Sequence, residues 1–289
     1  MRLNRFNPNT IRVGQGGSGG RFPGGGGGKI GCGTIIIAII AALVFGGDPG
    51  QYIGALENTR QSAPQPAGPS GQSAEEICTQ NAYALESCNA LSSLDETWAP
   101  IFQQAGIEFS QPKLWFYQGG TRSGCGSASS AMGPFYCPAD SGIYIDTSFY
   151  DQMAQRMGAG GDFARYYVMA HEYGHHIQYL TGLASQVRSA QQQDPRASNQ
   201  LQVRMELQAD CYAGVWASLN RNLIEPGDLE EGMTAASAIG DDTLQRSAGQ
   251  RVNPEAFTHG TSAQRMQWLR TGLRTGNSDA CDTFADLQR

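Results

Sequence analysis

The chain has 289 residues and a formal net charge of −6 at pH 7, with 20 lysines and arginines against 26 aspartates and glutamates. Its only lysines are Lys29 and Lys113, and no basic cluster follows residue 47. The chain therefore does not have the basic surface that nucleic-acid binding requires. Its length suits one domain of about 200 residues with attached segments.

Residues 1–29 are basic and rich in glycine, and they contain no acidic residue. We expect a cytoplasmic leader that cannot build a core, because glycine and arginine offer little apolar surface. Residues 30–47 carry no charge and consist mainly of Ile, Ala, Leu and Val, at the short end of the length that spans a bilayer. The first acidic residue, Asp48, follows directly. This charge distribution predicts one transmembrane helix, with the N-terminus in the cytoplasm and the rest of the chain extracytoplasmic.

Two alternatives exist for the apolar run. A cleaved signal peptide is disfavoured by the long leader and by the lack of a clear A-x-A site after the run. A buried core helix is disfavoured because the flanks do not continue in an amphipathic pattern. Residues 48–73 mix Pro, Gly, Ser and Gln, which predicts an extended, flexible linker. The globular domain is then expected at residues 74–289.

Six cysteines follow the apolar run, which itself contains Cys32. An even number beyond a membrane anchor indicates disulfide bonds in an oxidising compartment, although sequence cannot choose among the possible pairings. We expect neighbours to pair, as Cys78 with Cys88, Cys125 with Cys137, and Cys211 with Cys281. Buried free thiols are the alternative. No C-x-x-C pair occurs, which disfavours a cysteine-based zinc site.

In the globular part, the sequence pattern predicts strands first and helices after them. Residues 73–106 have helical spacing in their second half, residues 112–118 predict a strand, and residues 134–149 predict two short strands around a turn. From Ser148 onward the pattern is almost entirely helical. This order favours an α+β domain, mostly helical with a small β-sheet.

The segment His171-Glu172-Tyr173-Gly174-His175 is the H-E-x-x-H motif of zinc peptidases. On a helix, His171 and His175 lie one turn apart on the same face, so both imidazoles can reach one metal ion. Glu172 flanks that face and can act as general base on a zinc-bound water. A core helix with satisfied histidines is the alternative. His176 points away from the metal face and is expected to be structural or exposed.

A catalytic zinc usually has three protein ligands and a water. The residues at positions 178 and 181 are Gln and Thr, which excludes the metzincin extension of the motif. Downstream, Glu206 and Asp210 lie one turn apart in a helical segment with largely apolar neighbours. We expect Glu206 as the third ligand of Zn²⁺ and Asp210 as acceptor for the free N–H of a ligand histidine. A solvated helical face is the alternative, but a buried carboxylate pair without a cation would be costly.

Together, HEYGHHIQ, ELQADCYAG and FTHGTSAQRMQW resemble the putative neutral zinc metallopeptidase family of bacterial membrane-anchored proteins. The resemblance covers roughly residues 30–275 and includes GPFYCPADSGIYIDTSFY ahead of the zinc helix. It implies zinc-peptidase ancestry. The H-E-x-x-H motif with a downstream E-x-x-x-D resembles the gluzincin arrangement, which implies a zincin-like fold.

These features predict a zinc metallopeptidase that hydrolyses peptide bonds in exported proteins or peptides. We expect Glu172 to move the proton, His259 to stabilise the oxyanion, with Tyr144 a weaker candidate, and residues 143–146 to form the edge strand that pairs with substrate. His259 as an ordinary loop histidine stays open. Two other functions also stay open: a catalytically silent, zinc-stabilised binding or assembly module tethered to the membrane, and a zinc amidase acting on cell-wall peptides.

Overall fold

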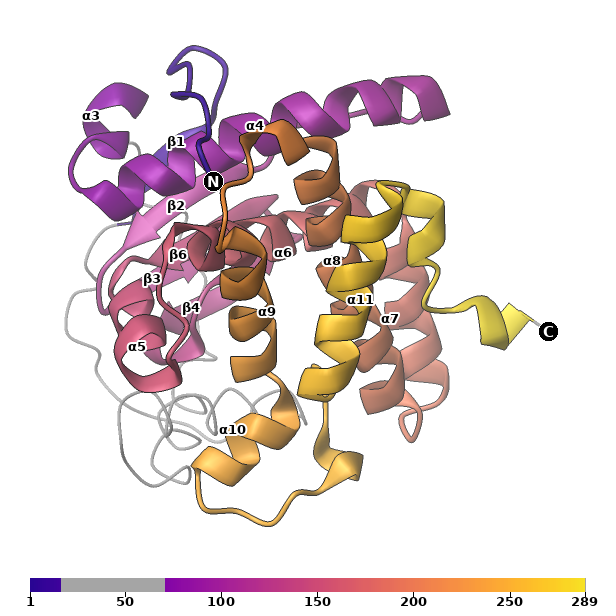
Figure 1. Ribbon diagram of the computed structural model, residues 1–289. Helices are drawn as coiled ribbons and strands as arrows, with labels where there is room; N and C mark the ends of the chain where they lie inside the picture. Colours follow the sequence, from indigo (N-terminus) through magenta and orange to yellow (C-terminus); the bar gives the residue numbers. More distant parts are fainter. Residues whose placement is uncertain (17–70, 289) are drawn as a thin grey trace.

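The computed structural model describes residues 1–16 and 71–288 (Figure 1). Its strands are β1 (Val13–Gln15), β2 (Lys113–Tyr117), β3 (Gly120–Ser123), β4 (Gly126–Ser129), β5 (Phe135–Cys137) and β6 (Gly142–Asp146). Its α-helices are α3 (Ala74–Cys78), α4 (Ala82–Ala105), α5 (Ser148–Met157), α6 (Asp162–Leu180), α7 (Leu183–Gln193), α8 (Ser198–Leu219), α9 (Asp228–Ala238), α10 (Asp241–Ser247) and α11 (Ser262–Thr275). The α+β class with a small sheet is therefore confirmed.

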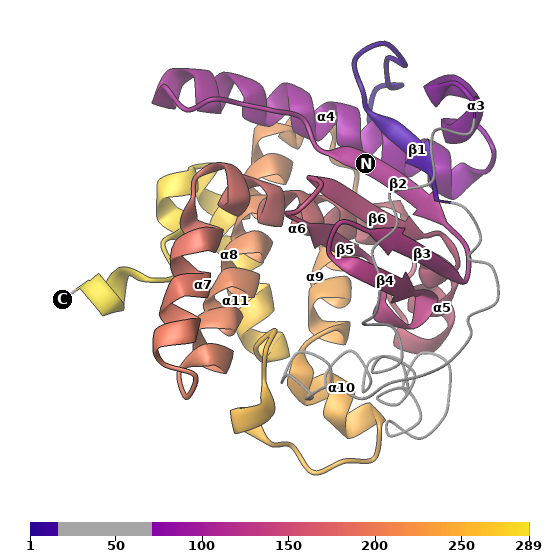
Figure 2. The ribbon, with the colours of Figure 1, turned by 180° about the vertical axis from the view of Figure 1, so that it is seen from behind.

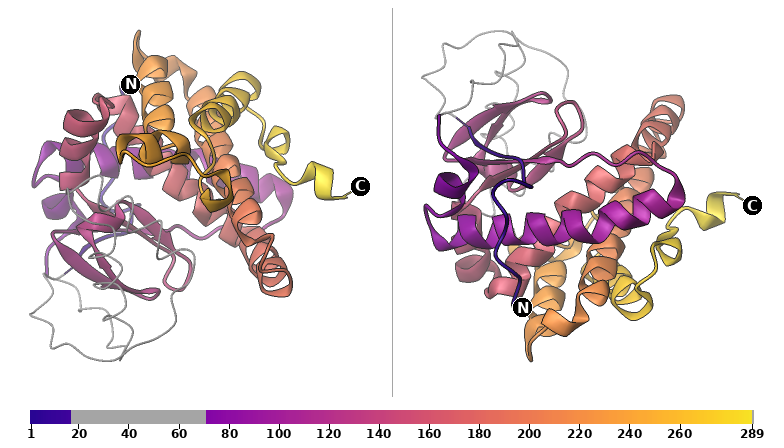
Figure 3. Two further views of the ribbon diagram at one scale, coloured as in Figure 1. Left: turned by 90° about the horizontal axis from the view of Figure 1, so that it is seen from below. Right: turned by 90° about the horizontal axis from the view of Figure 1, so that it is seen from above.

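Helix α6 lies at the centre of the molecule. Figures 1 and 2 show the sheet on one side of it and helices α8, α9 and α11 on the other. Helix α4 lies across one end of the molecule, as Figure 3 shows from above. One hydrophobic core joins these layers and includes Leu91 of α4, Tyr167 of α6 and Trp216 of α8.

Helical structure begins earlier after residue 73 than the sequence pattern indicated. Ser73 and Glu76 form a reciprocal capping box that starts α3, and the Asn81 side chain caps the start of α4. Such caps satisfy the free N–H groups of the first turn. Helix α4 then continues to Gly106, whose positive φ of 69° ends it.

The main sheet has the strand order β1-β2-β6-β5. Strands β1, β2 and β6 are parallel, and β5 runs antiparallel to β6. Every residue of β6 is buried, with Ile143 and Ile145 in the main core and Tyr144 in a smaller cluster on the other face. The expectation that residues 143–146 form an edge strand is therefore wrong. A strand that is apolar on both faces belongs inside a sheet, and β5 occupies the edge.

Residues 1–16 pack onto the domain, so the expectation that residues 1–29 add nothing to the core is wrong for this part. Met1, Phe6 and Ile11 are buried, and β1 pairs with β2. The α-amino group of Met1 lies 2.8 Å from a carboxylate oxygen of Asp228. The average composition of residues 1–29 hid this role, because the glycine tract falls in the second half and the apolar residues in the first.

The predicted transmembrane segment, residues 30–47, and most of the predicted linker, residues 48–73, lie outside the described residues. Within residues 1–16 and 71–288, no helix has the length and apolar character needed to cross a membrane. A single crossing by residues 30–47 would place residues 1–16 and 71–288 on opposite sides of the membrane, whereas the structure packs these two ranges together.

The three expected disulfide bonds are all present. Cys78–Cys88 joins α3 to α4, and Cys125–Cys137 joins the β3–β4 turn to the edge strand β5. Cys211–Cys281 ties α8 to the C-terminal segment.

Candidate metal centre

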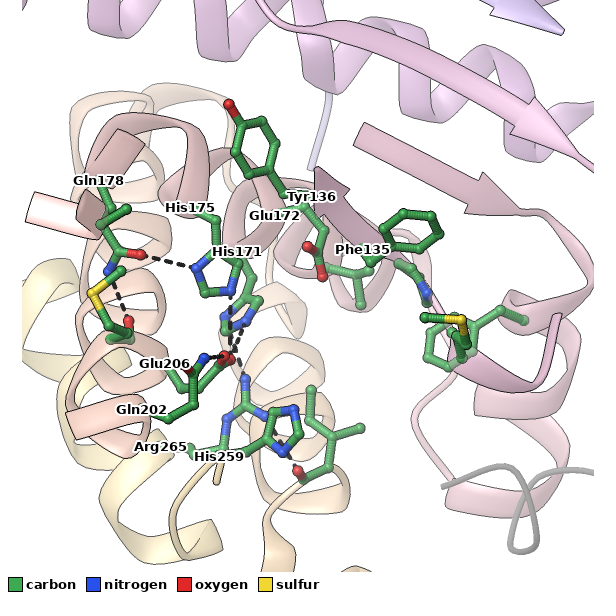
Figure 4. A pocket seen from close by; sticks show the side chains of 18 of the residues that line it. Phe135, Tyr136, His171, Glu172, His175, Gln178, Gln202, Glu206, His259 and Arg265 are labelled. Carbon is green, nitrogen blue, oxygen red and sulfur yellow. Dashed lines mark hydrogen bonds and ion pairs between the residues drawn. The ribbon is translucent and has the colours of Figure 1, made fainter. Parts of the chain in front are cut away.

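Two helices bring the expected ligands together. His171 and His175 lie one turn apart on α6, and Glu206 faces them from α8 (Figure 4). The Glu206 Oε2 atom lies 3.1 Å from His171 Nε2 and 3.5 Å from His175 Nε2. These three are the members of one group whose ligand atoms lie within 4.8 Å of one another.

A glycine sets the distance between these helices. A Cβ atom on Gly174, between the two histidines, would lie only 2.9 Å from Ala209 Cα of α8. The backbones of α6 and α8 can therefore approach closely only because Gly174 has no side chain. This contact brings the histidine face of α6 to the level of Glu206.

The donor set fits zinc. Ligand atoms placed about 2.0–2.1 Å from a tetrahedral zinc lie about 3.3 Å apart, which matches the two nitrogen–oxygen separations at Glu206 Oε2. Each imidazole has a hydrogen-bond acceptor at Nδ1, which leaves Nε2 directed toward Glu206. Two imidazole lone pairs facing one carboxylate repel it unless a proton or a cation lies between them.

Glu206 is held as a carboxylate. Its second oxygen, Oε1, accepts a hydrogen bond of 2.8 Å from the Gln202 amide. Burial alone would raise the pKa of Glu206, but the neighbouring histidines His175, His259 and His171 hold that pKa well below its usual range.

His171 is oriented by a fully buried ionic network. Asp210 Oδ1 accepts hydrogen bonds from His171 Nδ1 at 2.8 Å and from the Tyr167 hydroxyl at 2.6 Å. Arg265 of α11 donates to both Asp210 oxygens, each at 2.9 Å. Burial alone would raise the pKa of Asp210, but Arg265 and His171 lower it to about 2. The structure thus places Asp210 where the sequence analysis expected it.

Arg265 and Tyr167 were not among the site residues expected from the sequence. Helix α11 reaches α8 at two glycines, since a Cβ on Gly214 would lie 2.2 Å from Leu269 O and a Cβ on Gly272 only 2.0 Å from Cys211 O. Arg265 lies between apolar positions of its helix, which indicates a buried arginine. Its partner Asp210 could not be found from the sequence, because the contact depends on how α11 packs against α8.

His175 is oriented by a neutral side chain that the sequence analysis also missed. Its Nδ1 lies 2.9 Å from the Gln178 side-chain oxygen on the next turn of α6. Gln178 is fully buried and donates to α8.

Glu172 lines a cavity of about 350 Å³ together with the three expected ligands. Much of its wall is apolar, with contributions from Met132, Phe135, Phe149, Met157, Val168 and Leu244. Figure 4 shows Phe135 on the side of Glu172 and Gln178 on the side of His175. The site can therefore hold an apolar side chain next to the carboxyl group of Glu172.

Of the two expected oxyanion stabilisers, only His259 lines this cavity. Its Nδ1 lies 3.2 Å from Asp241 Oδ1, and Asp241 Oδ2 accepts the backbone N–H groups of residues 258, 259 and 260. Burial lowers the pKa of His259, but Glu206 and Asp241 outweigh this effect and raise it overall. Tyr144 is buried in the cluster on the far face of the sheet, where its hydroxyl donates to Asp140, so it is not placed at the site.

His176, expected to be structural or exposed, is buried. Its two ring nitrogens lie 2.9 Å from the Tyr136 hydroxyl and 2.6 Å from the Ser110 carbonyl oxygen.

Comparisons with known proteins agree with this geometry. The family described as putative neutral zinc metallopeptidase matches residues 4–284. The protein YpfJ of Escherichia coli K12, described as uncharacterized, is 44% identical over 278 residues, covering 93% of this chain and 91% of YpfJ. Rv2575 of Mycobacterium tuberculosis H37Rv, also described as uncharacterized, is 42% identical over 211 residues, covering 68% of this chain and 69% of Rv2575. No solved structure matches the chain.

Proposed function

The chain belongs to the putative neutral zinc metallopeptidase family, and from this membership and the site geometry we propose that it is a zinc-dependent peptidase with a zincin-like fold. His171, His175 and Glu206 hold the zinc, and Glu172 is the general base and acid. The observation that carries the proposal is the arrangement of one carboxylate and two Nε2 atoms at the separations of tetrahedral ligands, with Glu172 beside them in the same cavity.

A bound zinc lowers the pKa of a coordinated water toward neutrality and polarises the scissile carbonyl. Glu172 accepts the proton of the attacking water and transfers it to the nitrogen of the leaving amine. The buried Asp210 keeps His171 in the tautomer that presents Nε2 to the metal.

His259 is the proposed donor to the developing oxyanion. Asp241 positions it twice, through the contact with Nδ1 and through the backbone N–H groups on both sides of it. The Asp241 carboxylate beside Nδ1 favours the protonated form of the His259 ring. A rigid donor of this kind stabilises charge without reorganisation during the reaction.

The substrate backbone is proposed to pair with β5, the edge strand that borders the cavity through Phe135 and Tyr136. Because Glu172 passes its proton to the leaving nitrogen, the residue that supplies this nitrogen lies on the Glu172 side of the site. Val168, one turn before Glu172 on α6, and Phe135 line the cavity there. We therefore expect a bulky apolar side chain at that substrate position, and peptide-library profiling with the purified enzyme measures this preference.

The direct test replaces Glu172 with Gln. The variant keeps the shape of the side chain and should bind zinc like the parent, while peptide hydrolysis should fall by about 10²–10⁴-fold. Zinc content and cleavage of a peptide library are measured side by side. Unchanged cleavage would exclude Glu172 from the mechanism.

A silent, zinc-stabilised module is the second candidate. A purely structural zinc is normally closed by a fourth protein ligand, but among residues 1–16 and 71–288 the histidine-containing group has three members. If the zinc-loaded parent cleaves nothing in a broad peptide and protein panel while binding zinc stoichiometrically, this second candidate replaces the first. An amidase acting on cell-wall peptides would appear in the same assay as turnover of those peptides alone.

We also propose that the domain works outside the cytoplasm, where exported proteins or peptides are its substrates. The three disulfide bonds support an oxidising compartment. A single-pass anchor at residues 30–47, with residues 1–29 in the cytoplasm, would require residues 1–16 to leave the domain on which they pack.

Labelling of intact cells with a membrane-impermeant thiol reagent tests both statements. The exposed residues Asn9 and Glu108 are each replaced with Cys in separate variants. Labelling at position 108 alone supports the single-pass orientation. Labelling at both positions supports the packing of residues 1–16 on an extracytoplasmic domain, and labelling at neither position overturns the proposed location.

A further inference from the structure

We propose that Gln178 is a positioning residue that holds the metal ligand His175, and that Gln208 of α8 holds Gln178 in turn. This inference rests on the proposed function, because it takes His175 as a zinc ligand. It assigns a role to two glutamines that the H-E-x-x-H motif does not include.

The contacts form one continuous chain. His175 Nδ1 lies 2.9 Å from Gln178 Oε1. Gln178 Nε2 donates to the backbone carbonyl oxygen of Met205 at 2.7 Å and to Gln208 Oε1 at 3.0 Å. Gln208 Nε2 then donates to the backbone carbonyl oxygen of Cys281 at 3.1 Å.

The partners determine which way the Gln178 amide faces. Met205 O can only accept, so the nitrogen of Gln178 must face α8 and its oxygen must face His175. An amide oxygen only accepts as well, so His175 must carry its proton on Nδ1. The lone pair of Nε2 is then directed toward Glu206, where a metal ion needs it.

Burial of the two glutamines makes these hydrogen bonds costly to break. Gln178 is fully buried and Gln208 is nearly so. A buried amide that loses a partner keeps the full cost of its desolvation, so each glutamine is held in one rotamer. His175 itself is more exposed than His171, with 17% of its side chain accessible against 7%. His175, the more exposed of the two histidine ligands, is therefore held in place by the buried Gln178.

A disulfide bond fixes the end of this hydrogen-bond series that lies farthest from His175. The Cys211–Cys281 disulfide joins α8 to the segment whose carbonyl accepts from Gln208. Gln208 lies three residues before Cys211 on α8, so the disulfide and the hydrogen bond fix the same short stretch. The position of His175 thus depends on α8 and on the C-terminal segment, as well as on its own helix.

The two ligand histidines differ in the charge of their acceptor. His171 has the carboxylate of Asp210, whereas His175 has a neutral amide. A carboxylate acceptor raises the basicity of an imidazole, and an amide mainly orients it. We therefore expect Gln178 to act on the geometry and tautomer of His175, and this role has a spectroscopic signature.

The first experiment measures zinc affinity by chelator competition in the full chain. Gln178→Met keeps the length of the side chain and removes both hydrogen-bonding atoms, and it should weaken zinc binding by about 10–100-fold. Gln208→Met should weaken zinc binding less than Gln178→Met because it acts one step further away. Gln178→Glu retains the acceptor and should bind zinc more tightly than Gln178→Met.

Gln245→Met is the matched control. Gln245 is also buried, but its side-chain oxygen accepts from the backbone N–H of Asn253 and not from a metal ligand. This variant should lose stability and keep zinc affinity within about twofold of the parent. A Gln178→Met affinity within the same twofold limit would overturn the proposal. A parent that binds no zinc would instead overturn the proposed function.

The second experiment needs no variant and so cannot fail through misfolding. Long-range ¹H–¹⁵N correlation spectra of the zinc-loaded parent report which ring nitrogen of each histidine carries the proton. The proposal requires His175 with Nδ1 protonated and Nε2 bound to metal, and the opposite tautomer excludes it. A third experiment uses the variants: the visible spectrum of the cobalt-substituted protein should change in Gln178→Met and stay unchanged in Gln245→Met, because only the first alters the ligand geometry.

Discussion

Helix α6 faces a buried aspartate on each of two sides, and the two carboxyls differ in charge. On the metal side, Asp210 accepts hydrogen bonds from Tyr167, His171 and Arg265, and its pKa falls to about 2. On the side that packs against α4, Asp95 accepts one from the Tyr173 hydroxyl at 2.6 Å. Its other oxygen has no hydrogen-bond partner within the described part of the chain, and burial raises its pKa to about 7.

Each carboxyl therefore has a tyrosine of α6 as donor at the same distance, and both are buried. The difference lies in the cations, since Asp210 has an arginine and a histidine beside it. Burial alone favours the neutral acid, and only paired charges with full hydrogen bonding keep a carboxylate ionised in the core. On one side of α6, Arg265 and His171 keep Asp210 ionised. On the α4 side, no such cation pairs with Asp95 among the residues that the structure describes, and burial favours its neutral form.

Removing Arg265 is the largest expected perturbation. Arg265→Met leaves Asp210 ionised and buried without its main partner, which should lower the free energy of unfolding by about 3–5 kcal/mol. Urea denaturation of the metal-free protein measures this loss. Arg270→Met, an exposed arginine on the same helix, is the control and should change stability by less than about 0.5 kcal/mol. If the two variants lose the same amount, Asp210 does not depend on Arg265.

On the α4 side of α6, replacing Asp95 should increase the free energy of unfolding. In the folded protein Asp95 holds its proton up to a pKa of about 7, whereas in the unfolded chain it ionises near its ordinary value of 3.8. The folded state then binds more protons between these values, so this group lowers stability as pH rises from about 4 to about 7 and adds nothing further above that. Asp95→Asn should remove the effect and be more stable than the parent by about 2–4 kcal/mol at pH 8.

The measurement is urea unfolding of both proteins between pH 4 and pH 8. Asp151→Asn is the control, because Asp151 is exposed and also accepts from a tyrosine hydroxyl, that of Tyr83. A constant difference between Asp95→Asn and the parent at all pH values would show that Asp95 is charged throughout, and the contrast with Asp210 would then disappear.

The smallest expected loss of stability comes from breaking a third contact of α6, the one between His176 and Tyr136 of β5. Burial lowers the pKa of His176 to about 4, so its ring is neutral at physiological pH and its Nδ1 accepts from the Tyr136 hydroxyl. Tyr136→Phe leaves that nitrogen unpaired and should cost about 1–2 kcal/mol. Thermal unfolding measures it against Tyr179→Phe, whose ring also lies near His176 but is 43% exposed. Equal stability of the two variants would mean that the hydroxyl contributes nothing.

The parts of the site that could be predicted are those set by local spacing. His171, Glu172 and His175 lie within two turns of one helix, and Glu206 and Asp210 lie within two turns of another, so helical periodicity alone places each group on one face. The three cysteine pairs followed from nearness along the chain and from elimination.

The missed residues depend on contacts between distant segments. Gln178 lies on the same helix as His175, three residues after it, but its amide is turned toward Nδ1 by Met205 and Gln208 of α8. The edge strand was misplaced because the pattern of residues 143–146 does not show how many strands flank it. Residues 1–16 were judged by average composition, which does not show that a few apolar side chains meet a core.

By itself, the sequence determined most of the helices after residue 148 and the H-E-x-x-H spacing, because helical spacing is a short-range property of the backbone. The tertiary structure alone decided which charges are compensated, which strand is at the edge and which amide orients His175. These outcomes depend on the closeness of helix packing at Gly174, Gly214 and Gly272, where the absence of a side chain lets two backbones meet. The energy of a buried polar group is set by its partners in space, and those partners can lie far away along the chain, as for Tyr167 and Arg265 at a separation of 98 residues.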